Sequence, residues 1–149
     1  MGLVERGPRT HIYLDANAII RSIEGGVGSL AFLIEMASEN LVHLYTSELT
    51  LAEVLVGPLK QSQPGLAKFY EEMLVSDDYL TVVPVGRDVL RRSADIRATT
   101  ASKGADAIHV ATAMYSTCTL FISSDKRIRL PNGMTRIDID QVEDLDVWT

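Results

Sequence analysis

Short apolar runs alternate with amphipathic helical segments along most of this 149-residue chain. The apolar runs predict strands at 11–14, 41–46, 80–85 and 119–123, with a fifth candidate at 136–139. Apolar side chains that recur every three or four residues predict helices at 16–23, 28–40, 47–56, 65–75, 87–102 and 105–116. Strands that alternate with helices are typical of crossover units, whose strands pair in parallel. The alternation therefore predicts one α/β domain with a mostly parallel sheet of four or five strands.

Charge is distributed unevenly along the chain. Fourteen basic and twenty acidic residues give a net charge of −6, which by itself argues against a nucleic-acid partner. Residues 87–136 nevertheless hold nine basic side chains and four acidic ones, whereas residues 137–149 hold five acids and no base. The basic segment could attract phosphate groups, or it could be the solvated face of a helix. Charge alone leaves both interpretations open.

The sequence has no feature of a membrane protein or of a disulfide scaffold. Cys118 is the single cysteine, so it cannot form an internal disulfide, and we expect it to be a small buried apolar side chain. No segment reaches the roughly 20 apolar residues that a transmembrane helix needs, and the first ten residues lack the apolar run of a signal peptide. We therefore expect a cytoplasmic protein without a membrane partner.

Four acidic residues have positions that permit one shared crevice, and two of them, Asp15 and Asp125, fall at the carboxyl ends of strands, where a parallel sheet binds its ligands. Asp15 follows the first strand, Asp125 lies two residues past the fourth, Asp106 opens a helix, and Glu53 shares a helix face with apolar residues. If the four carboxylates meet, burial and mutual repulsion raise their pKa values, and a hard divalent cation such as Mg²⁺ or Mn²⁺ relieves the repulsion. The chain has three histidines and no Cys/His spacing suited to zinc, which favours a site made of oxygen ligands.

Each of these acids also has an ordinary structural role open to it. Asp15 and Asp106 suit the N-cap position of the helices that follow them. Glu53 completes an S/T-x-x-E capping box with Thr50 if the helix begins there. Asp125 is a common residue type in turns. These roles do not explain why all four positions permit one shared crevice.

The segments that contain the four acids resemble those of the PIN-domain nucleases, particularly the VapC-type toxin ribonucleases. The resemblance extends from residue 12 to about 139 and depends on the order and separation of four motifs. They read Leu-Asp-Ala-Asn at 14–17, Ser-Glu-Leu-Thr-Leu-Ala-Glu-Val at 47–54, Asp-Ala-Ile-His-Val-Ala-Thr-Ala at 106–113 and Phe-Ile-Ser-Ser-Asp at 121–125. The resemblance implies a PIN-like three-layer α/β/α domain at 11–140, an N-terminal extension at 1–10 and an acidic C-terminal tail at 141–149.

The same resemblance implies that Asp15, Glu53, Asp106 and Asp125 are the catalytic residues and the ligands of Mg²⁺ or Mn²⁺. The implied reaction is endonucleolytic hydrolysis of RNA that leaves 5′-phosphate and 3′-hydroxyl ends. The resemblance further implies a homodimer, and a cognate antitoxin protein that obstructs the acidic groove.

Residues beside these acids are given supporting roles. Asn17 and Ser123 would hold ligands or waters by hydrogen bonding, although Asn17 also suits the start of a helix. Lys126 and Arg127 are candidates for binding the RNA backbone, or are exposed turn charges. His109 falls where the family varies, so we expect it to be structural.

Two alternatives to a toxin ribonuclease remain. One is a non-catalytic PIN-like module that binds RNA or protein, and the other is a stand-alone RNA-processing nuclease without an antitoxin. All four acids are present, which favours activity over a binding module. Phosphoryl transfer of the haloacid-dehalogenase type fits less well, because that chemistry needs a second acid at position 17, which is Asn. Dinucleotide binding lacks its glycine-rich motif.

Overall fold

Five parallel strands form the centre of the fold in the computed structural model, which describes residues 8–144. Each strand pairs with its neighbours in parallel, in the order β3-β2-β1-β4-β5. The bounds are Thr10–Leu14 for β1, Val42–Ser47 for β2, Leu80–Val83 for β3, Leu120–Ile122 for β4 and Thr135–Ile137 for β5. The predicted parallel sheet is confirmed, and all its carboxyl ends lie at one edge.

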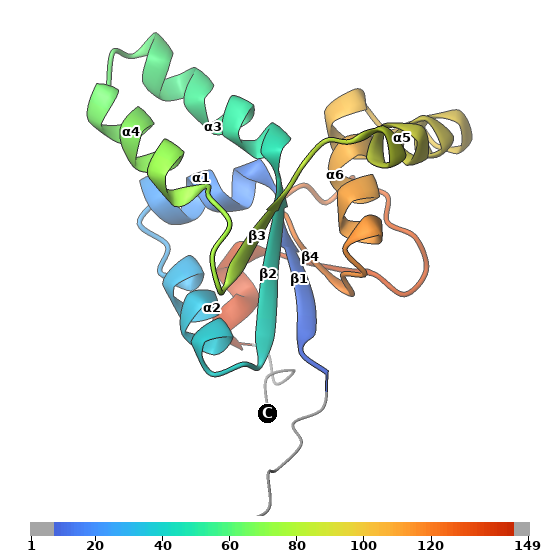
Figure 1. Cartoon of the computed structure of the whole chain (residues 1–149), viewed down its shortest axis with the longest axis horizontal. Helices are drawn as coiled ribbons and strands as arrows, with labels where there is room; N and C mark the ends of the chain where they lie inside the picture. Colours follow the sequence, from blue (N-terminus) through green and yellow to red (C-terminus); the bar gives the residue numbers. More distant parts are fainter. Residues whose placement is uncertain (1–7, 145–149) are drawn as a thin grey trace, which may run out of the picture.

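Helices cover both faces of this sheet (Figure 1). Five helical elements lie on one face: α1 (Ala16–Glu24), α2 (Ser29–Ser38), α3 (Glu48–Lys60), α4 (Pro64–Met73) and the 3-10 helix η1 (Ile139–Asp144). On the other face lie α5 (Arg87–Thr99) and α6 (Gly104–Tyr115). The predicted three-layer α/β/α arrangement is therefore confirmed.

The core is divided by the sheet into two apolar clusters. Alternate residues of a strand point to opposite faces, so Ile12 and Leu14 of β1 join the larger cluster with α1, α2 and η1. Tyr13, between them, joins the smaller cluster beside α6, where its ring stacks on Phe121 with centroids 4.9 Å apart. Cys118 is buried in that cluster, as the sequence predicts.

The two ends of the described chain lie near the predicted domain bounds. β1 begins at Thr10, and the first four residues of the predicted acidic tail complete η1, where Val142 is buried. Most of the predicted extension (1–7) and the end of the tail (145–149) lie outside the described residues. Within residues 8–144, no helix is both long enough and apolar enough to span a membrane.

Helix α3 differs from the sequence expectation at both ends. Its N-cap is Ser47, whose hydroxyl accepts a hydrogen bond from the Leu49 N–H at 3.0 Å, so the capping box that starts at Thr50 is wrong. The helix also continues past Gly57 and Pro58 to Lys60. A proline near the end of a helix removes one backbone hydrogen bond, and here Pro58 is buried by packing that the sequence pattern did not reveal.

We expect Ser47→Ala to lower the free energy of unfolding by about 1 kcal/mol, because the α3 N-terminus loses its side-chain cap. Urea unfolding monitored by circular dichroism measures the change. Ser38→Ala, at the exposed end of α2, is the matched control and should change stability by less than about 0.5 kcal/mol. Equal effects of the two substitutions would contradict the capping role of Ser47.

Candidate active site

The carboxyl ends of β1, β2 and β4 bring the predicted site residues to one edge of the sheet. Asp15 follows β1, and its N–H donates to the Ile122 carbonyl at 3.2 Å, which places it beside the end of β4. Helix α3 starts directly after β2 and carries Glu53, while Asp106 lies in the first turn of α6. Segments distant in the sequence therefore meet above the sheet (Figure 1).

Asp15 is both a helix cap and a buried carboxylate. Its Oδ1 accepts a hydrogen bond from the Ala18 N–H at 2.8 Å, so the predicted N-cap role is confirmed. The Ser123 side chain hydrogen-bonds to the same carboxylate. Burial raises the pKa of Asp15, and the charge of Glu53 raises it further, whereas the bonds from Ser123 and Ala18 oppose this shift. The site thus holds an acid whose charge is only partly compensated.

Asp106 does not cap α6. The N-cap is Lys103, which makes no side-chain capping bond, so the N-cap hypothesis for Asp106 is wrong. Burial raises the pKa of Asp106, and the charges of Asp125 and Glu53 act in the same direction. Asp106, Asp125 and Glu53 therefore lie within electrostatic reach of one another.

Asp125 is a turn residue, which is the ordinary structural role that the sequence analysis gives it. Its Oδ1 accepts a hydrogen bond from the Arg127 N–H at 2.9 Å and forms an ion pair with the Arg127 Nε at 3.6 Å. Asp125 also separates two clefts that hold most of the nearby basic side chains. One, of about 350 Å³, is lined by Ala101, Ser102, Lys103, Asp106, Asp125, Arg127, Ile128 and Arg129. The other, of about 480 Å³, is lined by Asn17, Ile20, Arg21, Ser124, Asp125, Lys126 and Arg127.

The supporting residues proposed from the sequence differ in their contacts. Ser123 is buried and links two acids, since it bonds to Asp15 and its hydroxyl accepts from the Asp125 N–H at 3.1 Å. Asn17 is exposed at the wall of the second cleft, where its side chain has no hydrogen bond to any residue in 8–144. Lys126 and Arg127 are exposed beside the same cleft.

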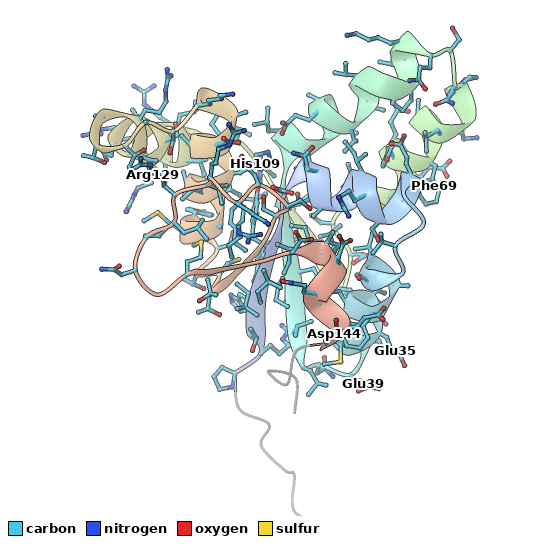
Figure 2. All side chains as sticks on the ribbon, turned by 180° about the vertical axis from the view of Figure 1, so that it is seen from behind. Glu35, Glu39, Phe69, His109, Arg129 and Asp144 are labelled. Carbon is cyan, nitrogen blue, oxygen red and sulfur yellow. The ribbon has the colours of Figure 1, made fainter. Side chains whose placement is uncertain are left out.

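Glu53 has a partner that sequence reasoning missed. The His109 Nε2 lies 2.5 Å from the Glu53 Oε1, and the His109 Nδ1 lies 2.5 Å from the Tyr13 hydroxyl. His109 is 3% exposed and lies on α6 beside the sheet (Figure 2). Its spacing of three residues from Asp106 places both on one helix face, a signal that could have linked His109 to the site.

Two further residues escaped the sequence analysis. The Ser124 Oγ is buried without a hydrogen-bond partner among residues 8–144, and Ser124 lines the cleft shared by Asn17 and Asp125. Arg136, on β5, donates to the Ser123 carbonyl at 2.7 Å and so braces the end of β4. The adjacent Ser-Ser-Asp sequence could have drawn attention to Ser124, whereas nothing in the sequence pairs position 136 with 123.

The donor chemistry of this edge suits a hard divalent cation. Carboxylate and hydroxyl oxygens are the ligands that Mg²⁺ and Mn²⁺ prefer, and the unpaired Ser124 Oγ adds a free oxygen at the wall of the cleft. The side-chain geometry is not that of an assembled metal cage: within residues 8–144, no three His, Cys, Asp or Glu side chains are grouped to hold an ion. Glu53 contacts His109 and Asp125 contacts Arg127 instead.

Comparison with known proteins identifies one family. Residues 12–132 match the PIN domain family. A comparison with curated protein sequences finds no match.

Several solved structures share the fold. The DNA-bound VapBC complex of Salmonella typhimurium has a chain that is 19% identical, with a TM-score of 0.70 over 87% of this chain and 98% of that one. A chain of VapBC2 from Rickettsia felis, bound to a promoter DNA fragment, is 14% identical with a TM-score of 0.67 over the same shares. VapC20 of Mycobacterium tuberculosis, a toxin that cleaves the sarcin-ricin loop, is 13% identical with a TM-score of 0.61 over 78% and 92%. At these identities the likeness shows the fold alone.

We expect Asp15→Asn to stabilise the protein in EDTA at pH 7, because asparagine keeps the helix cap and removes a buried charge. The raised pKa means that the native chain holds a proton that the unfolded chain has released, so wild-type stability falls as pH rises above the ordinary pKa. The advantage of the variant should therefore shrink as pH falls toward about 4. Urea unfolding at a series of pH values measures it.

Asp78→Asn, at an exposed loop position, is the control and should match the wild type within about 0.5 kcal/mol at each pH. A destabilised Asp15→Asn variant, or an advantage that does not depend on pH, would show that the carboxylate is needed for the fold and is not electrostatically strained.

Proposed function

This chain belongs to the PIN domain family, and from that membership we propose that it is a divalent-metal-dependent endoribonuclease that hydrolyses RNA phosphodiester bonds. PIN-domain VapC toxins are RNA-cleaving nucleases, which supports hydrolytic activity. The observation that supports the proposal is electrostatic: the charge of Glu53 raises the pKa of both Asp15 and Asp106, and the charge of Asp125 raises the pKa of Asp106. Asp15, Glu53, Asp106 and Asp125 are the proposed catalytic residues and metal ligands.

The acids of the proposed site differ in the contacts that hold them in place. A bound Mg²⁺ or Mn²⁺ would activate water for attack on the phosphodiester and neutralise developing charge. Asp15 is held in place by its helix cap and by Ser123, so it is oriented before a ligand arrives. Asp106 lies with Asp125 in the wall of one cleft, where both can face the same ligand.

The basic side chains beside the acids are suited to the phosphate backbone. The Arg127 side chain is 90% exposed and its Nε lies 3.6 Å from the Asp125 Oδ1, so solvent screens this ion pair and weakens it. Its guanidinium can therefore leave Asp125 for a phosphate, which binds two N–H groups at once. Lys126 lies beside it on one cleft, and Lys103 and Arg129 line the other, so RNA could cross the acids with contacts on both sides. Arg129 lies on the same side of the molecule as α5 and α6 (Figure 2).

We further propose that the protein is the toxin of a toxin–antitoxin pair. The support is that the similar folds include chains of VapBC complexes and of a toxin–antitoxin complex from Klebsiella pneumoniae. Val56 and Leu59 on α3 and Phe69 on α4 are large apolar side chains that are 47% to 67% exposed, a surface suited to a protein partner. A homodimer and a cytoplasmic location are part of the same proposal.

Purified wild-type protein should cleave single-stranded RNA in Mn²⁺ and leave 5′-phosphate and 3′-hydroxyl ends. Asp106→Asn should slow cleavage roughly 100-fold or more, since metal-assisted stabilisation is worth several kcal/mol and each 1.36 kcal/mol is a factor of ten. Gel assays with end-labelled RNA measure the rate, and Asp78→Asn serves as the control. RNA binding by the wild type without cleavage would instead support the non-catalytic module.

Metal binding can be measured without cleavage. At about 100 times its Kd, a site-specific Mn²⁺ should raise the free energy of unfolding of the wild type by about 2.7 kcal/mol relative to EDTA, and by clearly less in Asp106→Asn. Thermal and urea unfolding with Mn²⁺, Mg²⁺ or EDTA test this. No stabilisation at millimolar metal would contradict the proposed cofactor.

The antitoxin proposal is tested with the product of an adjacent gene. If the protein cleaves RNA but neither forms a complex with that product nor is inhibited by it, a stand-alone processing nuclease is favoured.

A further inference from the structure

We infer that His109, anchored by Tyr13, is the positioning residue that holds the Glu53 carboxylate at the site. The inference deepens the proposed metal-dependent nuclease and rests on it. Three side chains from β1, α6 and α3 form one continuous hydrogen-bonded chain, Tyr13–His109–Glu53, with 2.5 Å between donor and acceptor at both links. The chain runs from the buried core to the edge where the acids meet.

Tyr13, at the core end of this hydrogen-bonded series, is fixed by packing. Tyr13 is fully buried in β1 because strand alternation turns it toward α6, between Ile12 and Leu14 on the opposite face. Its ring stacks on Phe121 and meets the His109 ring edge-on at 5.7 Å between centroids. Burial raises the pKa of Tyr13 well above its ordinary value, so the hydroxyl keeps its proton and can donate it to the His109 Nδ1.

One tautomer of His109 satisfies both links. With the ring proton on Nε2, the imidazole accepts from the Tyr13 O–H at Nδ1 and donates to the Glu53 carboxylate from Nε2. Each group therefore has a defined direction, from the tyrosine through the imidazole to the carboxylate. The His109 side chain is 3% exposed, and rotation of its ring would break both hydrogen bonds.

Glu53, at the site end of this hydrogen-bonded series, needs such a restraint. The Glu53 side chain is 35% exposed and reaches out from α3, and a free glutamate side chain loses considerable rotamer entropy when it is held in one orientation. His109 engages Oε1, whereas Oε2 has no hydrogen bond or ion pair to any residue in 8–144. One oxygen is therefore used for orientation and the other stays available to a ligand.

A histidine has an advantage over a lysine or an arginine at this position. A lysine or arginine in place of His109 would carry a permanent positive charge and would compete with a bound cation for Glu53. The imidazole orients the carboxylate by one directional bond from Nε2 to Oε1. Outer partners that orient ligands in this way are typically worth about 10- to 100-fold in metal affinity or activity.

The test compares His109→Leu, His109→Gln and Tyr13→Phe in the full-length protein. His109→Leu removes the donor, His109→Gln restores a neutral N–H donor, and Tyr13→Phe removes only the anchoring hydroxyl. His43→Leu is the matched control, because His43 is a buried histidine near the amino end of β2 that bonds Thr81 at 2.7 Å, away from the site. Three readouts are needed: the free energy of unfolding in EDTA, Mn²⁺ affinity by calorimetry, and kcat and KM for RNA cleavage.

We expect His109→Leu to weaken Mn²⁺ binding and lower kcat by about 10- to 100-fold while the KM for RNA stays near the wild-type value. His109→Gln should recover most of both losses, Tyr13→Phe should show a smaller loss, and His43→Leu should show none. A purely structural histidine would change stability without separating kcat from KM, and glutamine would not rescue it.

Each other outcome overturns a defined claim. If His109→Leu folds and binds Mn²⁺ and cleaves RNA like the wild type, the positioning role is overturned while the nuclease stands. If His109→Leu does not fold, Tyr13→Phe decides the matter, and wild-type values of its Mn²⁺ affinity and kcat overturn the role. A wild-type protein that neither binds Mn²⁺ nor cleaves RNA overturns the proposed function and, with it, this inference.

Discussion

The carboxyl edge of the parallel sheet concentrates negative charge where water is partly excluded, and the rest of the site is organised around that charge. Asp15 and Asp106 have raised pKa values because burial and neighbouring carboxylates disfavour their ionised forms. A fold that tolerates this repulsion in the absence of a ligand must compensate for it elsewhere. The compensation comes from the two apolar clusters on either side of the sheet and from individual bonds to the acids.

Those individual bonds give structural roles to residues of the proposed site. Asp15 caps α1 while it faces the site, and Asp125 closes a turn while it lines two clefts. Ser123 connects these two acids, and Arg136 braces Ser123 from β5. A structural role found for such a residue is therefore no argument against a chemical one, because the cap or turn is what holds the carboxylate in its orientation.

The strand alternation of β1 links the core to the site. Ile12 and Leu14 pack under α1 and α2, which fixes the face to which Tyr13 points. Tyr13 then reaches His109, and His109 reaches Glu53. A change of one residue in the register of β1 would reverse these faces and remove the anchor. The acid on α3 is thus oriented by the same packing that builds the sheet.

The order of strands and helices could be predicted from the sequence because hydrophobic periodicity is a local property. The arrival of Asp15 and Asp125 at one edge could be predicted as well, since parallel strands end together. The partners of these acids could not be predicted in this way. Glu53 meets a histidine 56 residues away, and Asp106 leaves the cap position to Lys103. Pro58 is buried inside α3, which continues past the glycine and proline expected to end it. Spacing along the chain determines which face a residue occupies, whereas its rotamer and its hydrogen-bond partner depend on side chains that only the packed tertiary structure brings within reach.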